Sequence, residues 1–380
     1  MKKSLLIAAL AGFALVSCTE NDLDQSVKVQ EAITFSAPVV KPNTKAATEV
    51  GNVYDTSLKF RVWGHYYEGN EYTTFSDGMV YIDEAQCTYN STSNTWIPSK
   101  DGNTYYWPKN GTLTFIAYHP STDVLAAKTS VSNKGLTISN YFVDNAQPNT
   151  DMEDLMFSER AYNMKKSSQG DLSDPVLSPY AGVDLQFRHA LASIAFNAKQ
   201  DKAYPGTEVK IKGISLSNVV TEGTFCQNLD DANGETTKTD KLTLGTSATA
   251  AAWTWGASAT KAKYTVDLTA TALDNDADIA AFWPCTNGFV APALGNFRAT
   301  DLMLIPQDVS TVKLRIDYSI ETVDSDPINQ YYEVDLTGSW KIGYRYVYNI
   351  TFSFDPITFA PTVDVWVDEN KAIDNGYMNL

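Results

Sequence analysis

The sequence predicts an all-β protein built from antiparallel β-sandwiches. Short segments rich in Val, Ile, Thr, Tyr, Phe and Trp recur along the chain and are separated by clusters of Gly, Asn, Asp, Ser and Pro. Most of them alternate apolar and polar residues with a period of two, so one face of each strand lies in a core and the other meets water. The length of 380 residues exceeds what one core usually supports, so we expect two sandwich domains in tandem.

The alternation places the strands in order along the chain. Residues 187–195 also fit helical spacing, but the neighbouring segments favour a strand. A polar, Ser-rich stretch at 160–180 contains Pro175 and Pro179 and predicts a connection, which gives domains at 33–180 and 181–380. The expected strands are residues 58–65, 112–117, 183–191, 208–216, 264–268, 312–320, 331–336, 344–354 and 358–367, with long loops or hairpin tips at 228–241 and 246–260.

The N-terminus is typical of a secretory signal. Two lysines precede an apolar run at residues 4–16, which is too short to span a bilayer, and Ser17 and Cys18 follow it. The run ends in Leu-Val-Ser-Cys, which resembles the bacterial lipobox, so Cys18 is expected to become the first mature residue and to carry lipid. The alternative is an ordinary signal peptide with an incidental cysteine. Residues 1–17 are then the signal, and the polar stretch 18–32 is a flexible tether.

Charge and cysteine content limit the partners. The formal net charge is −16 and the pI is near 4.6, which excludes nucleic acid or an anionic membrane as the binding partner because both would be repelled. If Cys18 is lipidated, the thiols of Cys87, Cys226 and Cys285 remain, and they allow one disulfide at most. Disulfides therefore do not hold the fold together.

No catalytic or metal-binding motif is visible. His65, His119 and His189 lie far apart in the sequence, and no nucleophile elbow, His-Glu-x-x-His motif, Gly-rich phosphate loop or Cys-x-x-Cys pair occurs. Asp274, Asp276 and Asp278 have the spacing that opens a calcium loop, but Ile279 replaces the required glycine and Cys285 the final glutamate. We expect no enzyme activity, no cofactor and no metal, and a hydrolase would lack an identifiable acid or nucleophile.

Aromatic residues leave a second function open. A glycan-binding surface lipoprotein needs exposed rings that stack on sugars, whereas packing in a core is the usual role of aromatics in β proteins. The rings that could serve are those of Tyr105, Tyr106, Trp107, Trp253, Trp255, Trp283 and Trp366.

An ordered set of motifs resembles the fimbrillin family, the type V pilins and pilus accessory proteins of Bacteroidales, over nearly the whole chain. The element most typical of that family is Phe187-Arg188-His189-Ala190-Leu191-Ala192-Ser193-Ile194. The other matching pieces are the lipobox, Ile33-Thr34-Phe35-Ser36, Tyr105-Tyr106-Trp107-Pro108, residues 113–120, Asp154-Leu155-Met156-Phe157, Phe282-Trp283-Pro284, Leu304-Ile305-Pro306-Gln307 and residues 340–350.

The resemblance implies two transthyretin-like β-sandwich domains, export as a lipoprotein and assembly by strand exchange. The function would be that of a structural or adhesive subunit, or accessory protein, of a fimbria. Its partners would be other pilus subunits in a homo- or hetero-polymer, outer-membrane lipid through Cys18, and a ligand on a host or bacterial surface. The location would be the outer membrane, exposed at the cell surface, or the fimbrium itself.

On that model the removable strand is Ile33–Val40 and the donor is the last strand, residues 358–367. Proteolytic maturation would fall between Lys45 and Ala46, since Pro42 blocks cleavage after Lys41. The family's arginine site has no counterpart, because no arginine precedes Arg61, so a chain that stays full length is left open. In the last strand Val363, Val365 and Val367 point one way, which suits a groove-filling donor. An edge strand of its own sheet is the equal alternative.

Overall fold

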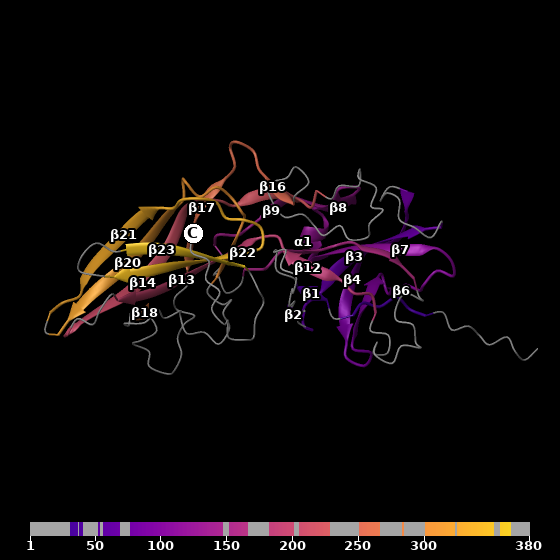
Figure 1. Ribbon diagram of the computed structural model, residues 1–380, viewed down its shortest axis with the longest axis horizontal. Coiled ribbons are helices and arrows are strands. Elements are labelled where there is room, and N and C mark those ends of the chain that lie inside the picture. The colour runs from indigo at the N-terminus through magenta and orange to yellow at the C-terminus, as the bar shows by residue number, and fades with distance from the viewer. Residues whose placement is uncertain are drawn as a thin grey trace, which may run out of the picture.

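The structure is a computed structural model, and it describes most of the chain between residues 31 and 365 (Figure 1). The described residues are 31–36, 38–40, 52–53, 56–68, 77–146, 152–165, 182–200, 205–228, 251–266, 283–284, 301–323, 325–352 and 358–365.

The all-β class predicted from the sequence is confirmed. The described ranges contain 23 strands and one short helix, α1 (Asp123–Ala126). Most neighbouring strands pair antiparallel, and the exceptions are β1 with β12 and β13 with β22. None of the helical structure described is long and apolar enough to cross a membrane.

A ten-stranded sheet occupies one end of the elongated molecule (Figure 1). Its centre is β7, which pairs with β3 on one side and with β10 and β11 on the other. Its order is β2 (Asn52–Val53), β1 (Val39–Val40), β12 (Gln186–His189), β10 (Met156–Ser158), β7 (Thr112–His119), β3 (Phe60–Tyr67), β4 (Met79–Asn90), β5 (Thr95–Lys100) and β6 (Asn103–Thr104), with β11 (Ala161–Met164) also on β7.

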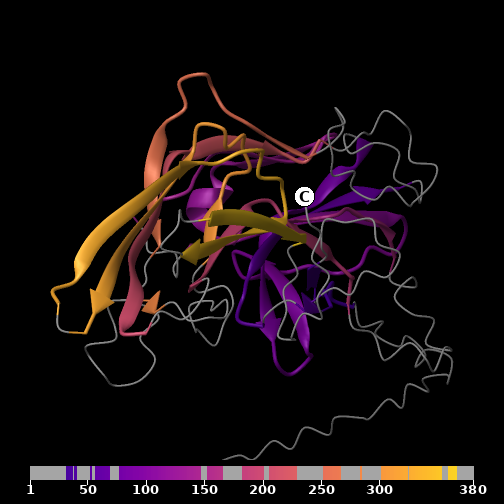
Figure 2. The same cartoon turned by 60° about the vertical axis from the view of Figure 1, so that its left-hand side comes forward.

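Three smaller sheets make up the rest, and the five-stranded one forms the opposite end (Figures 1 and 2). This sheet has the order β17 (Lys261–Val266), β14 (Thr207–Val220), β20 (Lys313–Thr322) and β21 (Ile328–Asp335), with β18 (Trp283–Pro284) also on β14. One four-stranded sheet has the order β19 (Leu302–Leu304), β13 (Ala192–Gln200), β22 (Tyr344–Phe352) and β23 (Thr358–Val365). The other has the order β16 (Ala252–Thr254), β15 (Glu222–Cys226), β9 (Gly135–Phe142) and β8 (Thr129–Ser132).

The sheets interleave the two halves of the chain. The ten-stranded sheet takes in β12, which follows residue 180, and β9 of the first half pairs with β15 of the second half. The division at residue 180 and the transthyretin-like form of each domain therefore stay predictions. Two of the expected connections contain short strands, because β11 lies within 160–180 and β16 within 246–260.

Two hydrophobic cores share the strand β7. Leu113, Phe115 and Ala117 face the first core, which also holds Ile33, Phe35, Phe60, Trp96 and Phe187. Ile116 and Tyr118 face the second core, which extends through all three smaller sheets. All eight residues of β7 are buried, so the expectation that this strand is half-buried is wrong. Thr112 and Thr114 lie on the same face as Ile116 and Tyr118, and this face is covered by the second core where water was expected. Threonine is common in strands and tolerates such burial.

A buried hydrogen bond and an ion pair fix the junction between β12 and β13. His189 contacts Asp154 through Nδ1 at 2.7 Å, and Arg188 donates from Nε to Glu159 at 2.7 Å. His189 is 1% exposed. A charged or polar group this deep needs such partners, because an uncompensated one costs several kcal/mol, on the order of 3–5. Arg188 and His189 of the family-typical motif thus have a structural role, because they hold β12 against the segment at residues 154–159.

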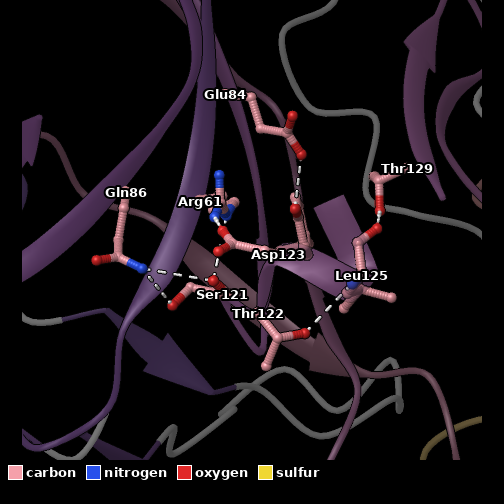
Figure 3. A network of polar contacts seen from close by, with 9 residues as sticks. Arg61, Glu84, Gln86, Ser121, Thr122, Asp123, Leu125 and Thr129 are labelled. Carbon is pink, nitrogen blue, oxygen red and sulfur yellow. Dashed lines mark hydrogen bonds and ion pairs between the residues drawn. The ribbon is translucent and has the colours of Figure 1, made fainter. Parts of the chain in front are cut away.

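A polar network fastens helix α1 to the ten-stranded sheet (Figure 3). Arg61 on β3 donates from Nε to the Ser121 carbonyl at 3.2 Å and forms an ion pair with Asp123. Gln86 on β4 donates to Ser121 Oγ at 3.0 Å. Thr122 caps the N-terminus of the helix, because its Oγ1 accepts a hydrogen bond from the backbone N–H of Leu125. The network lies at the surface, so its contribution to stability is modest.

A buried cluster of Asp301, Arg345 and Ser193 gives the first testable prediction. The Asp301 carboxylate is 2% exposed and accepts from Arg345 Nε at 2.7 Å and from Ser193 Oγ at 2.5 Å. Arg345→Ala should lower the free energy of unfolding by about 3–5 kcal/mol, because it leaves the carboxylate buried without its cation. Denaturant unfolding measures this loss.

The matched control is Arg315→Ala. Arg315 also bonds a carboxylate, that of Asp317, but both side chains are about 40% exposed, at 40 and 39%. Water can replace the lost bonds there, so the loss should be much smaller. Equal losses in the two variants would contradict the assignment of the Asp301 cluster as a buried ion pair.

Candidate interaction site at the N-terminal strand

The first described segment of the chain, residues 31–36, is built into the ten-stranded sheet like a strand. Ile33 and Phe35 are both 0% exposed, and Thr34 and Ser36, which alternate with them, are half-buried. This is the period of two that the sequence shows, with the apolar residues on the first-core side. The segment continues through Pro38 into β1.

One edge of this segment pairs with the strands around Trp96 and Tyr105. Phe35 and Trp96 exchange two backbone hydrogen bonds, both 2.9 Å long. Ile33 donates its N–H to the Tyr105 carbonyl at 2.8 Å, and Trp107 donates to the Glu31 carbonyl at 3.0 Å. The pairing is antiparallel.

The other edge pairs in parallel with the chain that follows residue 181. Ser36 donates its N–H to the Val183 carbonyl at 2.9 Å, and Val183 donates to the Thr34 carbonyl at 2.8 Å. The Ser36 hydroxyl adds a bond to the same carbonyl at 3.2 Å. Further along, β1 pairs with β12. The segment therefore satisfies the backbone of its neighbours on both sides.

The side chains of Ile33 and Phe35 fill an apolar groove. The Phe35 ring meets Phe60 and Phe115 edge to face, with centroids 5.8 and 5.3 Å apart. Full burial of such side chains contributes about 1.5–3 kcal/mol each. Cys87 belongs to the same core, and burial raises the pKa of its thiol well above the usual value, so it stays protonated at neutral pH. The groove is apolar and uncharged.

Gly182 lies tightly against the backbone of the segment. Its φ is +94°, and a Cβ at this position would meet three backbone atoms of residues 34–36 at 2.6–2.8 Å. Only glycine both adopts this positive φ without strain and leaves room for the backbone of the segment. Sequence reasoning did not single out Gly182, and the only signal for it is its place between a Pro-containing polar stretch and an apolar strand.

The predicted donor strand is the edge of a sheet within the same chain. The backbone of β23 pairs antiparallel with β22 along its whole length, with Val363 opposite Tyr346 and Val365 opposite Tyr344. Pro361 lies in the middle of β23, which suits an edge strand because proline has no N–H to donate. Cys18, Lys45, Ala46 and Val367 lie outside the described residues.

The other candidate residues do not gather into a catalytic or metal site. His65, His119 and His189 are all buried, at 7, 9 and 1% exposure. Within the described ranges no group of three or more His, Cys, Asp or Glu could hold a metal ion. Cys87 and Cys226 are free thiols, and Cys285 lies outside the described residues.

Comparison with known proteins gives one family match. The model of the family described as fimbrillin-like matches residues 44–366. No curated protein matches the chain in sequence.

Solved structures similar to this chain include three from Bacteroides species. A fimbrial protein from Bacteroides vulgatus is 16% identical with a TM-score of 0.56, and the match covers 88% of this chain and all of the other. Candidate cell adhesion proteins from Bacteroides uniformis and Bacteroides ovatus are 17 and 14% identical, with TM-scores of 0.45 and 0.49. These matches cover 87 and 90% of this chain and 98 and 100% of the others. The first of the three shows that the two chains share a fold.

Gly182 supplies the testable prediction for this site. Gly182→Ala should displace residues 34–36 and lower the free energy of unfolding by about 1–3 kcal/mol, since the change adds strain at positive φ and a clash. Hydrogen exchange of the Ile33 and Phe35 amides should become faster. The control is Gly102→Ala, because Gly102 has φ +77° but nothing within 4 Å of its Cβ position. If both variants leave the exchange of these amides unchanged, the close approach does not hold the segment.

Proposed function

The chain belongs to the fimbrillin-like family, and from this premise we propose that it is a structural or adhesive subunit, or an accessory protein, of a cell-surface fimbria. We propose that it assembles by exchange of β-strands with other pilus subunits. The observation that carries this proposal is the strand at residues 31–40, whose apolar side chains fill a groove and whose backbone completes the sheet on both edges. The similar solved structures are those of fimbrial or candidate adhesion proteins, and we propose no enzymatic role and no cofactor.

Removal of this strand would create a binding site for another one. The places of Ile33 and Phe35 would become an apolar groove, and the backbone groups of Trp96 and Val183 would lose their partners. Unpaired buried backbone groups and empty alternate pockets are what an incoming strand satisfies in β-strand addition. A donor strand with apolar residues at every second position would pair with these backbone groups and fill the apolar groove.

We propose that proteolysis between Lys45 and Ala46 opens the groove. This bond follows β1 in the chain, so its cleavage would leave residues 31–40 held only by non-covalent contacts. Those contacts include two buried side chains worth about 1.5–3 kcal/mol each and several backbone hydrogen bonds of about 1 kcal/mol each. A donor strand with equivalent contacts could therefore compete for the site.

We propose that the donor is the last strand of a neighbouring subunit, with Val363, Val365 and Val367 entering the groove. The alternation of these valines with polar residues supports this assignment. Their spacing of two matches that of Ile33 and Phe35. Because β23 is an edge strand, it could leave β22 without breaking pairs on a second side.

We further propose that the chain is an outer-membrane lipoprotein anchored through Cys18, with residues 1–17 removed as a signal. The tether expected at 18–32 would end before residue 31, because Glu31 and Ala32 already pair with the sheet. A single acyl chain holds a protein only marginally, so a multiply acylated cysteine would make a durable anchor. Its mature folded part would be two transthyretin-like domains, divided near residue 180. A subunit cleaved at Lys45 would lose this anchor and pass into the fimbrium.

The cleavage step can be tested with a Lys-specific protease. Digestion of the purified protein should yield a ladder of multimers on a non-reducing gel, and Lys45→Gln should abolish the ladder because the strand cannot leave. Lys41→Gln is the matched control, since Pro42 already blocks cleavage there, and it should give the normal ladder. Mass spectrometry that shows an N-terminus at Ala46 without any multimer would refute strand exchange at this groove.

The donor strand can be tested by a pair of substitutions. Val363→Asp should reduce multimer yield at least tenfold, because the carboxylate would have to enter an apolar groove. Thr362→Asp changes the other face of the strand and should leave the yield within about twofold. Thermal unfolding of both variants as monomers reports whether β23 still packs on β22. A Val363→Asp protein that polymerises normally would leave β23 as an edge strand of its own sheet.

A further inference from the structure

A shallow groove of about 430 Å³ lies on the sheet formed by β16, β15, β9 and β8. It is separate from the strand-binding groove, because its lining comes from β9, β15 and the chain that follows Trp253. The connection between β16 and β17 stands out from the body of the molecule in both views (Figures 1 and 2). Residues that line the groove include Asn140, Glu222, Thr224, Thr254, Trp255 and Ser258.

An exposed tryptophan borders this groove. Trp255 is 39% exposed, and Phe142, the cross-strand partner of Glu222, is 48% exposed. Trp253 differs, since it is 9% exposed and donates from Nε1 to the Ala190 carbonyl at 2.7 Å. Trp253 thus packs in the core and does not serve as a sugar-stacking ring, and Trp255 alone of this pair can meet a ligand.

Threonine hydroxyls belong to the same groove. Thr254 Oγ1 lies 3.5 Å from the Thr224 carbonyl oxygen, and Thr224 Oγ1 lies 3.5 Å from the backbone nitrogen of Asn140. Both distances are long for hydrogen bonds, so these hydroxyls keep most of their capacity to donate and accept. Gly256 leaves open space beside the tryptophan, because nothing lies within 4 Å of its Cβ position.

The charged residues that line the groove do not favour an anionic ligand. Glu222 is the one charged side chain among the described residues that line it. The nearby Lys128 ammonium donates to the Asn140 carbonyl at 2.7 Å. The whole chain carries a formal charge of −16. The lining itself thus offers an anion one carboxylate and no cation, and the net charge of the chain disfavours a phosphate, sulfate or sialic acid.

We propose that this groove binds a neutral glycan. One pyranose ring lies on the face of Trp255, and its hydroxyls bond to Thr224, Thr254 and Glu222. Aromatic rings with polar groups at their margins suit a ligand with an apolar C–H face and a rim of hydroxyls. A peptide fits less well, since the groove is shallow and has no deep apolar pocket for an anchoring side chain.

An array of oligosaccharides tests this proposal. The full-length protein, purified and labelled, is applied to neutral hexose and N-acetylhexosamine oligomers and to their sulfated and sialylated forms. We expect binding to a subset of the neutral oligomers and none to the anionic forms. Trp255→Ala should weaken this binding at least tenfold, whereas Trp255→Phe should retain most of it, since a phenyl ring can also stack.

Controls separate a lost site from a damaged fold. Tyr331→Ala removes another exposed ring, 60% exposed on the edge strand β21, and should bind as the unaltered protein does. Glu222→Gln keeps the shape of the groove and should change affinity without changing the thermal unfolding midpoint. Absence of binding to every neutral oligomer, preference for anionic ones, or capture of peptides in place of glycans by the same groove would overturn the proposal. So would equal losses in Trp255→Ala and Tyr331→Ala.

Discussion

Backbone pairing on both edges of residues 31–36 is the constraint on which the rest of the site depends. A buried N–H or carbonyl must find a partner, and here Trp96 on one side and Val183 on the other find theirs in the same short segment. Trp96 and Val183 are 87 residues apart in the sequence and belong to different halves of the molecule. The segment thus closes a sheet that would otherwise have a gap, and its removal changes the surface of both halves at once.

The shared strand β7 explains how such a change could be tolerated. Its residues face two cores, and the described residues of the N-terminal segment belong to the first core alone. The second core contains side chains from all three smaller sheets, none of which pairs with residues 31–36. Loss of Ile33 and Phe35 would therefore weaken one core directly and leave the packing of the other in place.

Period-two alternation predicted nine of the 23 described strands, missed long ones such as β4 and β9, and did not predict which strands pair. β20 and β22 show the alternation as expected, because each has one face in the core. The parallel pairing of β13 with β22 joins residues about 150 apart in sequence, and nothing local encodes it. Trp253 and Trp255 are two residues apart and would share a face in a continuous strand. Instead β16 ends at Thr254, so one ring stays in the core and the other leaves the sheet.

The strand-binding groove and the Trp255 groove share no residue, and this separation has a physical consequence. The first is lined by the first core and is completed by a strand, whereas the second lies on a sheet face whose buried side belongs to the second core. Filling one groove with a donor strand would not cover the other. If both proposals hold, each subunit of a polymer would present its own neutral-glycan site, and many weak sites on one fibre would bind a surface far more tightly than any single one.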